Sequence, residues 1–126
     1  MNPNLYLDVD GVLLFIDQEN TWLFNLLLSN KNRFWKIFWL SSWTRNGTDD
    51  LLYKYHPKFK LLKAKPLKWV ANKTEAINWK RPFIWLEDGI IEEERRIFNQ
   101  KATPGQQVWE CYPGEWIYFK RKTAGR

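Results

Sequence analysis

A chain of 126 residues has room for one domain, and its shares of hydrophobic (44%) and charged (27%) residues exclude a wholly disordered protein. A single cysteine and a single histidine exclude an internal disulfide framework, a cysteine-rich zinc site and any mechanism that needs two imidazoles in one chain. The formal net charge is +6, and no apolar run reaches the length of about 18 residues that a membrane span needs. The opening residues lack the basic segment of a secretory signal, so we expect a soluble, cytoplasmic protein.

Short apolar runs that end in polar residues or turns predict the strands of the fold. They lie at residues 5–7, 34–40, 83–86 and 107–112, and residues 116–119 are expected to pack back on the sheet. Helical patterns lie between them at about residues 20–30, 48–55, 73–79 and 92–98, and we interpret the acidic residues 92–94 as a solvated helix start. Residues 12–16 form either a flap or the entry to a helix, and residues 58–72 are expected to be a basic loop with a short strand around 69–70.

This alternation of strands and helices predicts an α/β fold, a three-layer sandwich with a mostly parallel central sheet. Residues 1–119 would form the single domain, and residues 120–126 would be a basic C-terminal tail.

Polar side chains with the chemistry of a phosphate site follow three of the predicted strands. In parallel sheets the carboxyl ends of the strands meet at one edge, where ligands bind, so these side chains are expected to converge. They are Asp8 and Asp10, Ser41 and Ser42, and Glu87 and Asp88. Carboxylates gathered this closely repel one another unless a cation lies between them, and Mg²⁺ prefers such oxygen ligands. The sequence therefore predicts a Mg²⁺ site that also binds a phosphate ester.

Four residues have the chemistry for phosphoryl transfer through a covalent intermediate. Asp8 could attack phosphorus, and Asp10 could protonate the leaving oxygen and later activate water. Ser41 could donate to a phosphoryl oxygen, and Lys73 could neutralise the charge that develops there. Ser42 or Thr44 remains an alternative to Ser41, and Lys68 or Lys80 an alternative to Lys73.

These residues together resemble the motifs of the haloacid-dehalogenase-like hydrolases. The segment from Asp8 to Val12 resembles the first motif, and an apolar strand ending in Ser41 resembles the second. Lys73 before a helix resembles the third motif, and a strand ending in Glu87 and Asp88 resembles the fourth. The match spans residues 4 to about 90 in the expected order and is most similar to the small family associated with Swiss-army-knife RNA-repair proteins.

The resemblance implies a role for each matched position. Asp8 would be the nucleophile, and Asp10 the acid/base whose backbone carbonyl also touches Mg²⁺. Glu87 and Asp88 would complete the metal site, although the family's usual pair is two aspartates. The phosphate would be held by Gly11, Ser41, Ser42 and Lys73. The gaps between motifs leave no room for a large cap domain, and such an open site favours large substrates.

The basic residues are concentrated in one part of the chain, where residues 54–81 contain nine lysines and arginines against one acid, Glu75. Such a stretch with interleaved aromatics suits nucleic acid, although it would also form a merely solvated face. We therefore expect a phosphohydrolase acting on RNA or DNA ends or on nucleotides, with Trp43 and Arg45 as possible substrate contacts. The alternative is a non-catalytic nucleic-acid-binding module on the same fold.

Overall fold

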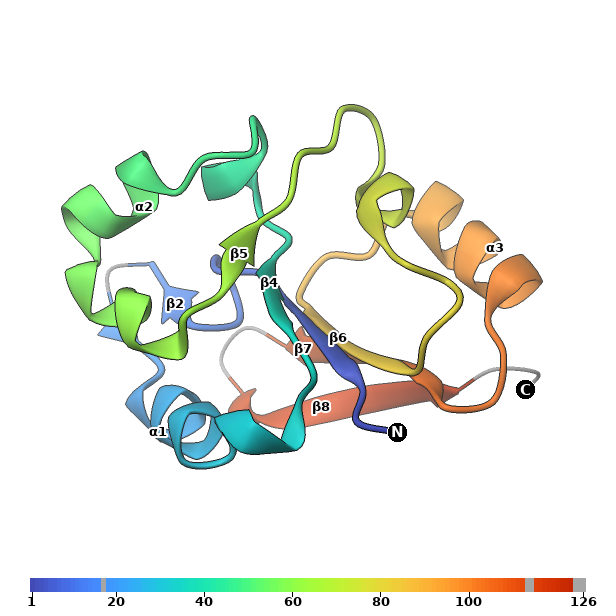
Figure 1. Ribbon diagram of the computed structural model, residues 1–126, viewed down its shortest axis with the longest axis horizontal. Helices are drawn as coiled ribbons and strands as arrows, with labels where there is room; N and C mark the ends of the chain where they lie inside the picture. Colours follow the sequence, from blue (N-terminus) through green and yellow to red (C-terminus); the bar gives the residue numbers. More distant parts are fainter. Residues whose placement is uncertain (17, 113–114, 124–126) are drawn as a thin grey trace.

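The structure is a computed structural model that describes residues 1–16, 18–112 and 115–123, with side chains described as far as residue 111. Its centre is a six-stranded sheet in the order β5-β4-β1-β6-β7-β8 (Figure 1). The strands are β1 (Asn4–Leu7), β4 (Ile37–Trp39), β5 (Lys65–Pro66), β6 (Phe83–Glu87), β7 (Gln106–Tyr112) and β8 (Glu115–Thr123). The first five strands in this order are parallel to one another, and β8 is antiparallel to β7. The predicted α/β fold with a mostly parallel sheet is confirmed.

Short helices connect the strands. They are α1 (Thr21–Ser29), α2 (Asp50–Tyr55) and α3 (Glu92–Lys101), together with the 3₁₀ turns η1 (Lys31–Arg33), η2 (Ser42–Thr44), η3 (Pro57–Leu62) and η4 (Lys73–Ala76). The Asn20 side chain accepts a hydrogen bond from the Leu23 N–H and so caps α1. No helix in the described part of the chain is long and apolar enough to cross a membrane.

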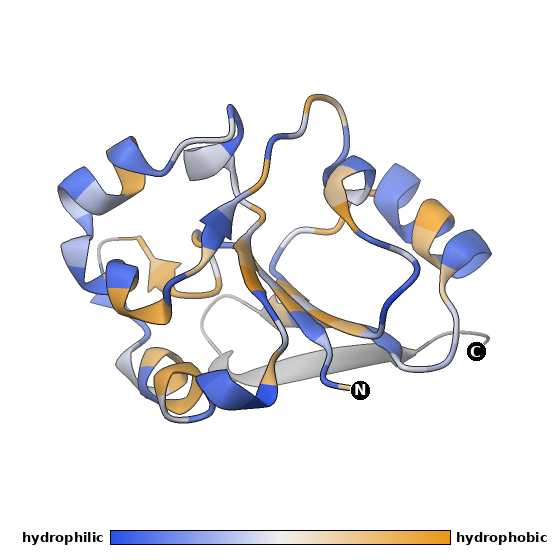
Figure 2. Ribbon diagram, in the orientation of Figure 1, coloured by the Kyte–Doolittle hydropathy of each residue, from blue (hydrophilic) through white to orange (hydrophobic). Residues whose placement is uncertain are grey.

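The strand residues alternate between two cores on opposite faces of the sheet. Leu5 and Leu7 belong to a core that α1, α2 and η3 cover, whereas Tyr6 belongs to a second core that includes Phe98 of α3. In Figure 2, hydrophilic and hydrophobic bands alternate along α3, as is typical of a helix that packs one face on a core. Trp39 lies in the first core and Trp85 in the second, and both are fully buried.

Three local predictions were wrong. The helix expected over residues 73–79 is only the 3₁₀ turn η4 at residues 73–76, because a capping box between Asn72 and Glu75 starts the turn and the extended backbone of Ile77 ends it. The strand expected around residues 69–70 lies instead at β5, which pairs with β4. Glu94 is buried and not solvated.

The backbone also shows the structure of the segment after β1 and of part of the predicted C-terminal tail. Residues 14–15 and 18–19 form a small antiparallel hairpin, β2 (Leu14–Phe15) and β3 (Gln18–Glu19), which is the flap that was one of two expectations for this segment. Of the predicted basic tail, residues 120–123 are part of β8, and residues 124–126 lie outside the described residues.

Candidate active site

Three carboxylates meet at the carboxyl edge of two adjacent strands. Asp8 follows β1, Glu87 ends β6 and Asp88 comes next, and the two strands pair in parallel with Leu7 beside Leu86. One oxygen from each carboxylate lies within 4.8 Å of the other two. Asp8 and Glu87 are buried, whereas Asp88 is half-buried. The register of two parallel strands therefore brings Asp8 beside Glu87, although the two residues are 79 positions apart in the sequence.

A single buried ammonium lies against this carboxylate cluster, which we define as Asp8, Glu87 and Asp88. Lys73 Nζ lies 2.6 Å from Glu87 Oε1 and 3.3 Å from Asp8 Oδ2. The Lys73 side chain is only 10% exposed, so water screens these two ion pairs weakly. Lys73, at the start of η4, is thus the lysine that the fold brings to the cluster.

Lys73 is positioned by Glu94, a residue that the sequence interpretation missed. Glu94 Oε2 accepts the backbone N–H of Lys73 at 2.9 Å, which ties η4 to α3. The other oxygen, Oε1, accepts the N–H of Ile91, the residue before the helix, at 3.3 Å. The position before the helix is Ile91 and not the Ser, Thr, Asp or Asn of a capping box, so the local sequence carried no signal for the buried role of Glu94.

One positive charge is too little for three carboxylates, and the directions of their pKa shifts reflect this. Burial, and then the neighbouring Glu87, raise the pKa of Asp8 well above its usual range, although Lys73 partly opposes the shift. Burial and Glu87 also raise the pKa of Asp88 to about 6. Burial alone would raise the pKa of Glu87, but hydrogen bonds and the Lys73 charge outweigh it and lower that pKa. The pKa of Lys73 is raised, since its two carboxylate partners outweigh burial. The raised pKa values of Asp8 and Asp88 show that the cluster favours a proton, or a second cation in its place, more than isolated carboxylates would.

The donor set fits a hard divalent cation. Carboxylate oxygens are the ligands that Mg²⁺ prefers, and bound metal displaces protons from such groups. Glu87 is the most engaged of the three, because its Oε2 accepts the N–H groups of Asp88 and Gly89 at 3.1 and 3.3 Å. Asp8 and Asp88 are thus the residues with most capacity left for an ion.

The first loop brings two further predicted residues to the cluster. Gly11 has a φ of +79°, and a Cβ at this position would overlap the Asp88 carboxylate, so only glycine fits this close approach. The Asp10 carboxylate is exposed, and its Oδ2 accepts the indole N–H of Trp43 at 3.2 Å. Asp10 is therefore held beside the carboxylate cluster and outside it.

The cluster opens into a cleft of about 370 Å³. Its lining includes Asp8, Asp10, Ser42, Trp69, Lys73 and Asp88. Trp69 was not predicted as a site residue, because it lies in a segment without a clear pattern. Its indole N–H donates to the Ser41 carbonyl at 3.2 Å, and the Arg45 guanidinium lies 4.4 Å from the ring centroid.

Of the two serines after β4, Ser42 lines this cleft, and Ser41 is not among its lining residues. Ser41 is buried, and its Oγ accepts the Trp43 N–H at 3.1 Å, so the hydroxyl caps η2. Thr44 is buried and donates to the Ser41 carbonyl.

The predicted substrate contacts Trp43 and Arg45 lie beside the first cleft. Together with Ser42 and Trp69 they line a second cleft of about 420 Å³. Lys68 also lines this second cleft, and Lys80 is exposed elsewhere.

The chain was compared with protein-family models, with curated proteins and with solved structures. No family model, no curated protein and no solved structure matches it.

Proposed function

We propose that the protein is a Mg²⁺-dependent phosphohydrolase with a three-layer haloacid-dehalogenase-like core, which cleaves a phosphomonoester through an aspartyl-phosphate. The observation that carries the proposal is the convergence of Asp8, Glu87, Asp88 and Lys73 at the carboxyl edge of adjacent parallel strands. In parallel α/β sheets this edge is where ligands bind. Bound at Asp8 and Asp88, Mg²⁺ would supply charge neutralisation and orientation for a phosphate ester.

The chemistry divides into two displacements at phosphorus. In the first, an Asp8 oxygen forms a bond to phosphorus, the bond to the ester oxygen breaks, and Asp10 gives that oxygen a proton. In the second, Asp10 takes a proton from water, whose oxygen attacks phosphorus, and the bond to Asp8 breaks to release inorganic phosphate. Lys73 stabilises negative charge near Asp8 in both steps. The exposed position of Asp10 at the cleft suits a group that exchanges protons with substrate and water.

The cleft supports a substrate larger than a simple phosphate ester. Ser42 and Trp69 line both this cleft and the second one, so the two clefts adjoin. The second cleft is lined by aromatic and basic side chains. Such surfaces suit bases and phosphates, so we propose terminal phosphates of RNA or DNA, or nucleotides, as the substrate class.

A non-catalytic nucleic-acid-binding module is the second candidate, and one observation favours it. Lys73 already pairs with two of the three carboxylates, and Glu87 accepts three hydrogen bonds. Much of the negative charge of the cluster is therefore balanced without a metal. A site of this kind would stabilise the fold without any turnover.

Phosphate release tests the two candidates. The substrates are an aryl phosphate and oligonucleotides with 5′- or 3′-phosphates, each in excess Mg²⁺ and in EDTA. Asp8→Asn removes the nucleophile, and Asp50→Asn on the exposed start of α2 is the matched control for loss of one carboxylate. We expect Mg²⁺-dependent release by the wild type and by Asp50→Asn, and a loss of at least about a thousandfold in Asp8→Asn. Equal release by Asp8→Asn, or none from the wild type, would contradict the proposal.

A further inference from the structure

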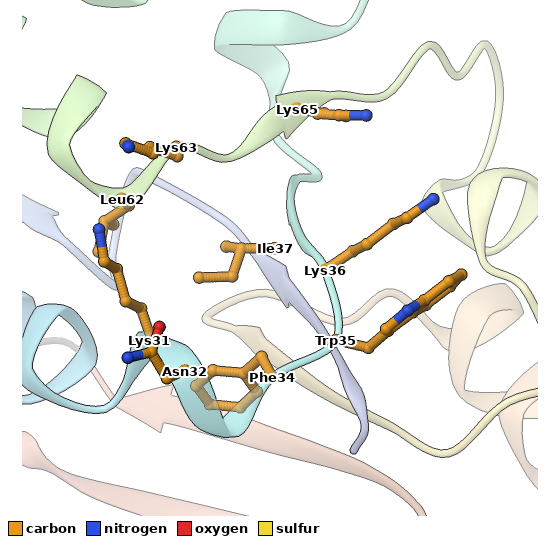
Figure 3. A pocket seen from close by; sticks show the side chains of 9 residues that line it. All are labelled: Lys31, Asn32, Phe34, Trp35, Lys36, Ile37, Leu62, Lys63 and Lys65. Carbon is orange, nitrogen blue, oxygen red and sulfur yellow. The ribbon is translucent and has the colours of Figure 1, made fainter. Parts of the chain in front are cut away.

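A basic groove of about 420 Å³ lies at the opposite edge of the sheet from the carboxylate cluster. It is formed by the segments that lead into β4 and β5, at the amino ends of these strands. We call it the amino-edge groove, and its main lining residues are Lys31, Trp35, Lys36, Ile37, Lys63 and Lys65. Figure 3 shows the four lysines around Ile37, with Trp35 beside Lys36.

The charge of the amino-edge groove is uncompensated. Its lining includes four lysines and no acidic residue, and none of the four takes part in a salt bridge within the described part of the chain. Lys36, Lys63 and Lys65 are exposed. Like charges around one concavity repel one another, so the arrangement favours an anionic occupant.

The backbone also places one of these lysines in an unfavourable conformation. Lys63 has a φ of 54°, in the left-handed region that favours glycine. This turn ends η3 and leads into β5, so it sets Lys63 and Lys65 along one side of the groove.

An aromatic surface lies beside the charges. Trp35 is 49% exposed, although large apolar side chains are usually buried. The Arg81 guanidinium lies 3.6 Å from the centroid of its ring, and Lys36 Nζ lies 4.3 Å from it. The indole is half-exposed and lies beside two cations, so a base that stacks on it would have its phosphates close to positive charge.

We infer that the amino-edge groove binds single-stranded nucleic acid, with phosphates on its lysines and a base against Trp35. A chain of phosphates matches several lysines around one groove, and unpaired bases can stack on the indole, whereas a free phosphate would use the lysines alone. This site is separate from the proposed active site and does not depend on catalysis there.

Fluorescence anisotropy with a 3′-labelled oligouridine of about 12 nucleotides tests this binding, in EDTA and with no terminal phosphate, so that the carboxylate cluster plays no part. On a single strand, each phosphate contact steepens the fall of log affinity with log salt concentration by about 0.7. At about 0.1 M salt, the loss of one such contact weakens binding roughly fivefold. The double variant Lys63→Gln/Lys65→Gln should therefore bind roughly 25-fold more weakly, with a slope smaller by about 1.4. The control Lys54→Gln/Lys101→Gln loses the same charge from α2 and α3, outside the groove, and should change affinity much less.

Trp35→Leu tests the stacking contact, and Trp35→Phe keeps an aromatic ring. We expect Trp35→Leu to weaken binding by about fivefold or more and Trp35→Phe to retain most of it. Equal losses in the two lysine double variants would overturn the inference, as would an unchanged affinity in Trp35→Leu. Groove-dependent binding to vesicles with anionic lipid that exceeds binding to the oligonucleotide would overturn nucleic acid as the occupant.

Discussion

Replacing Lys73 by methionine tests whether the carboxylate cluster depends on its single cation. The substitution keeps most of the apolar stem of the side chain and removes the ammonium that lies 2.6 Å from Glu87 and 3.3 Å from Asp8. At an effective dielectric constant of about 20, these separations correspond to attractions of about 6 and 5 kcal/mol, which the desolvation of the ammonium largely offsets. Removal of one partner from a buried pair typically costs about 3–5 kcal/mol, because the remaining charges stay buried without compensation. We expect Lys73→Met to lose about this much free energy of unfolding in EDTA.

Urea unfolding measures this loss, and two further variants identify its cause. Lys58→Met breaks an ion pair with Glu19 of similar length, 2.8 Å, in which the lysine side chain is 43% exposed. Because water screens that pair, its loss should cost about 0–1 kcal/mol. Combining Lys73→Met with Glu87→Gln should be less destabilising than the sum of the two single substitutions, by about 0.5–3 kcal/mol. A loss below about 1 kcal/mol in Lys73→Met would refute the reasoning that burial makes this cluster depend on the ammonium.

Three further predictions concern the loop, the pH response and the thiol. Gly11→Ala should lose about 1–3 kcal/mol of stability and weaken any stabilisation by Mg²⁺, because its Cβ overlaps the Asp88 carboxylate; unchanged urea midpoints with and without Mg²⁺ would contradict this. The pKa of Asp88 is raised from 3.8 to about 6 in the folded protein, so the native state holds this proton more tightly than the unfolded chain does. In EDTA the wild type should therefore lose stability relative to Asp88→Asn as the pH rises from about 4 through about 6, by on the order of 1 kcal/mol for a half-exposed group, and parallel pH profiles would contradict it. Burial, and then Asp88, raise the pKa of Cys111 to about 11, so its thiol should react slowly with a disulfide reagent at pH about 8 until urea unfolds the chain; rapid reaction of the native protein would contradict that burial.

The mostly parallel sheet and the carboxylate cluster were predictable from local patterns. The segments Leu5–Leu7 and Phe83–Leu86 are apolar, and an acidic residue follows each of them. Parallel pairing of the two strands then brings Asp8 and Glu87 together. This argument needs only strand direction and register. It therefore succeeds without knowledge of the loops.

The parts that sequence could not predict depend on packing between distant segments. Trp69 reaches the cleft because its indole binds the Ser41 carbonyl 28 positions away, which no local pattern indicates. The position of Ser42 in the cleft depends on the turn that Ser41 caps, because that turn decides which of two adjacent hydroxyls faces the cleft. Glu94 looked solvated within an acidic run, yet its contact with Lys73 buries it.

The most direct measurement of the central proposal is the detection of phosphate on the Asp8 side chain. The protein would be mixed with an aryl phosphate in Mg²⁺, quenched in acid within the first turnover and analysed peptide by peptide by mass spectrometry. The proposed mechanism predicts a phosphoryl group on the peptide that contains Asp8, which is absent in EDTA. Phosphate release without any label on that peptide, or a label on another peptide alone, would contradict it.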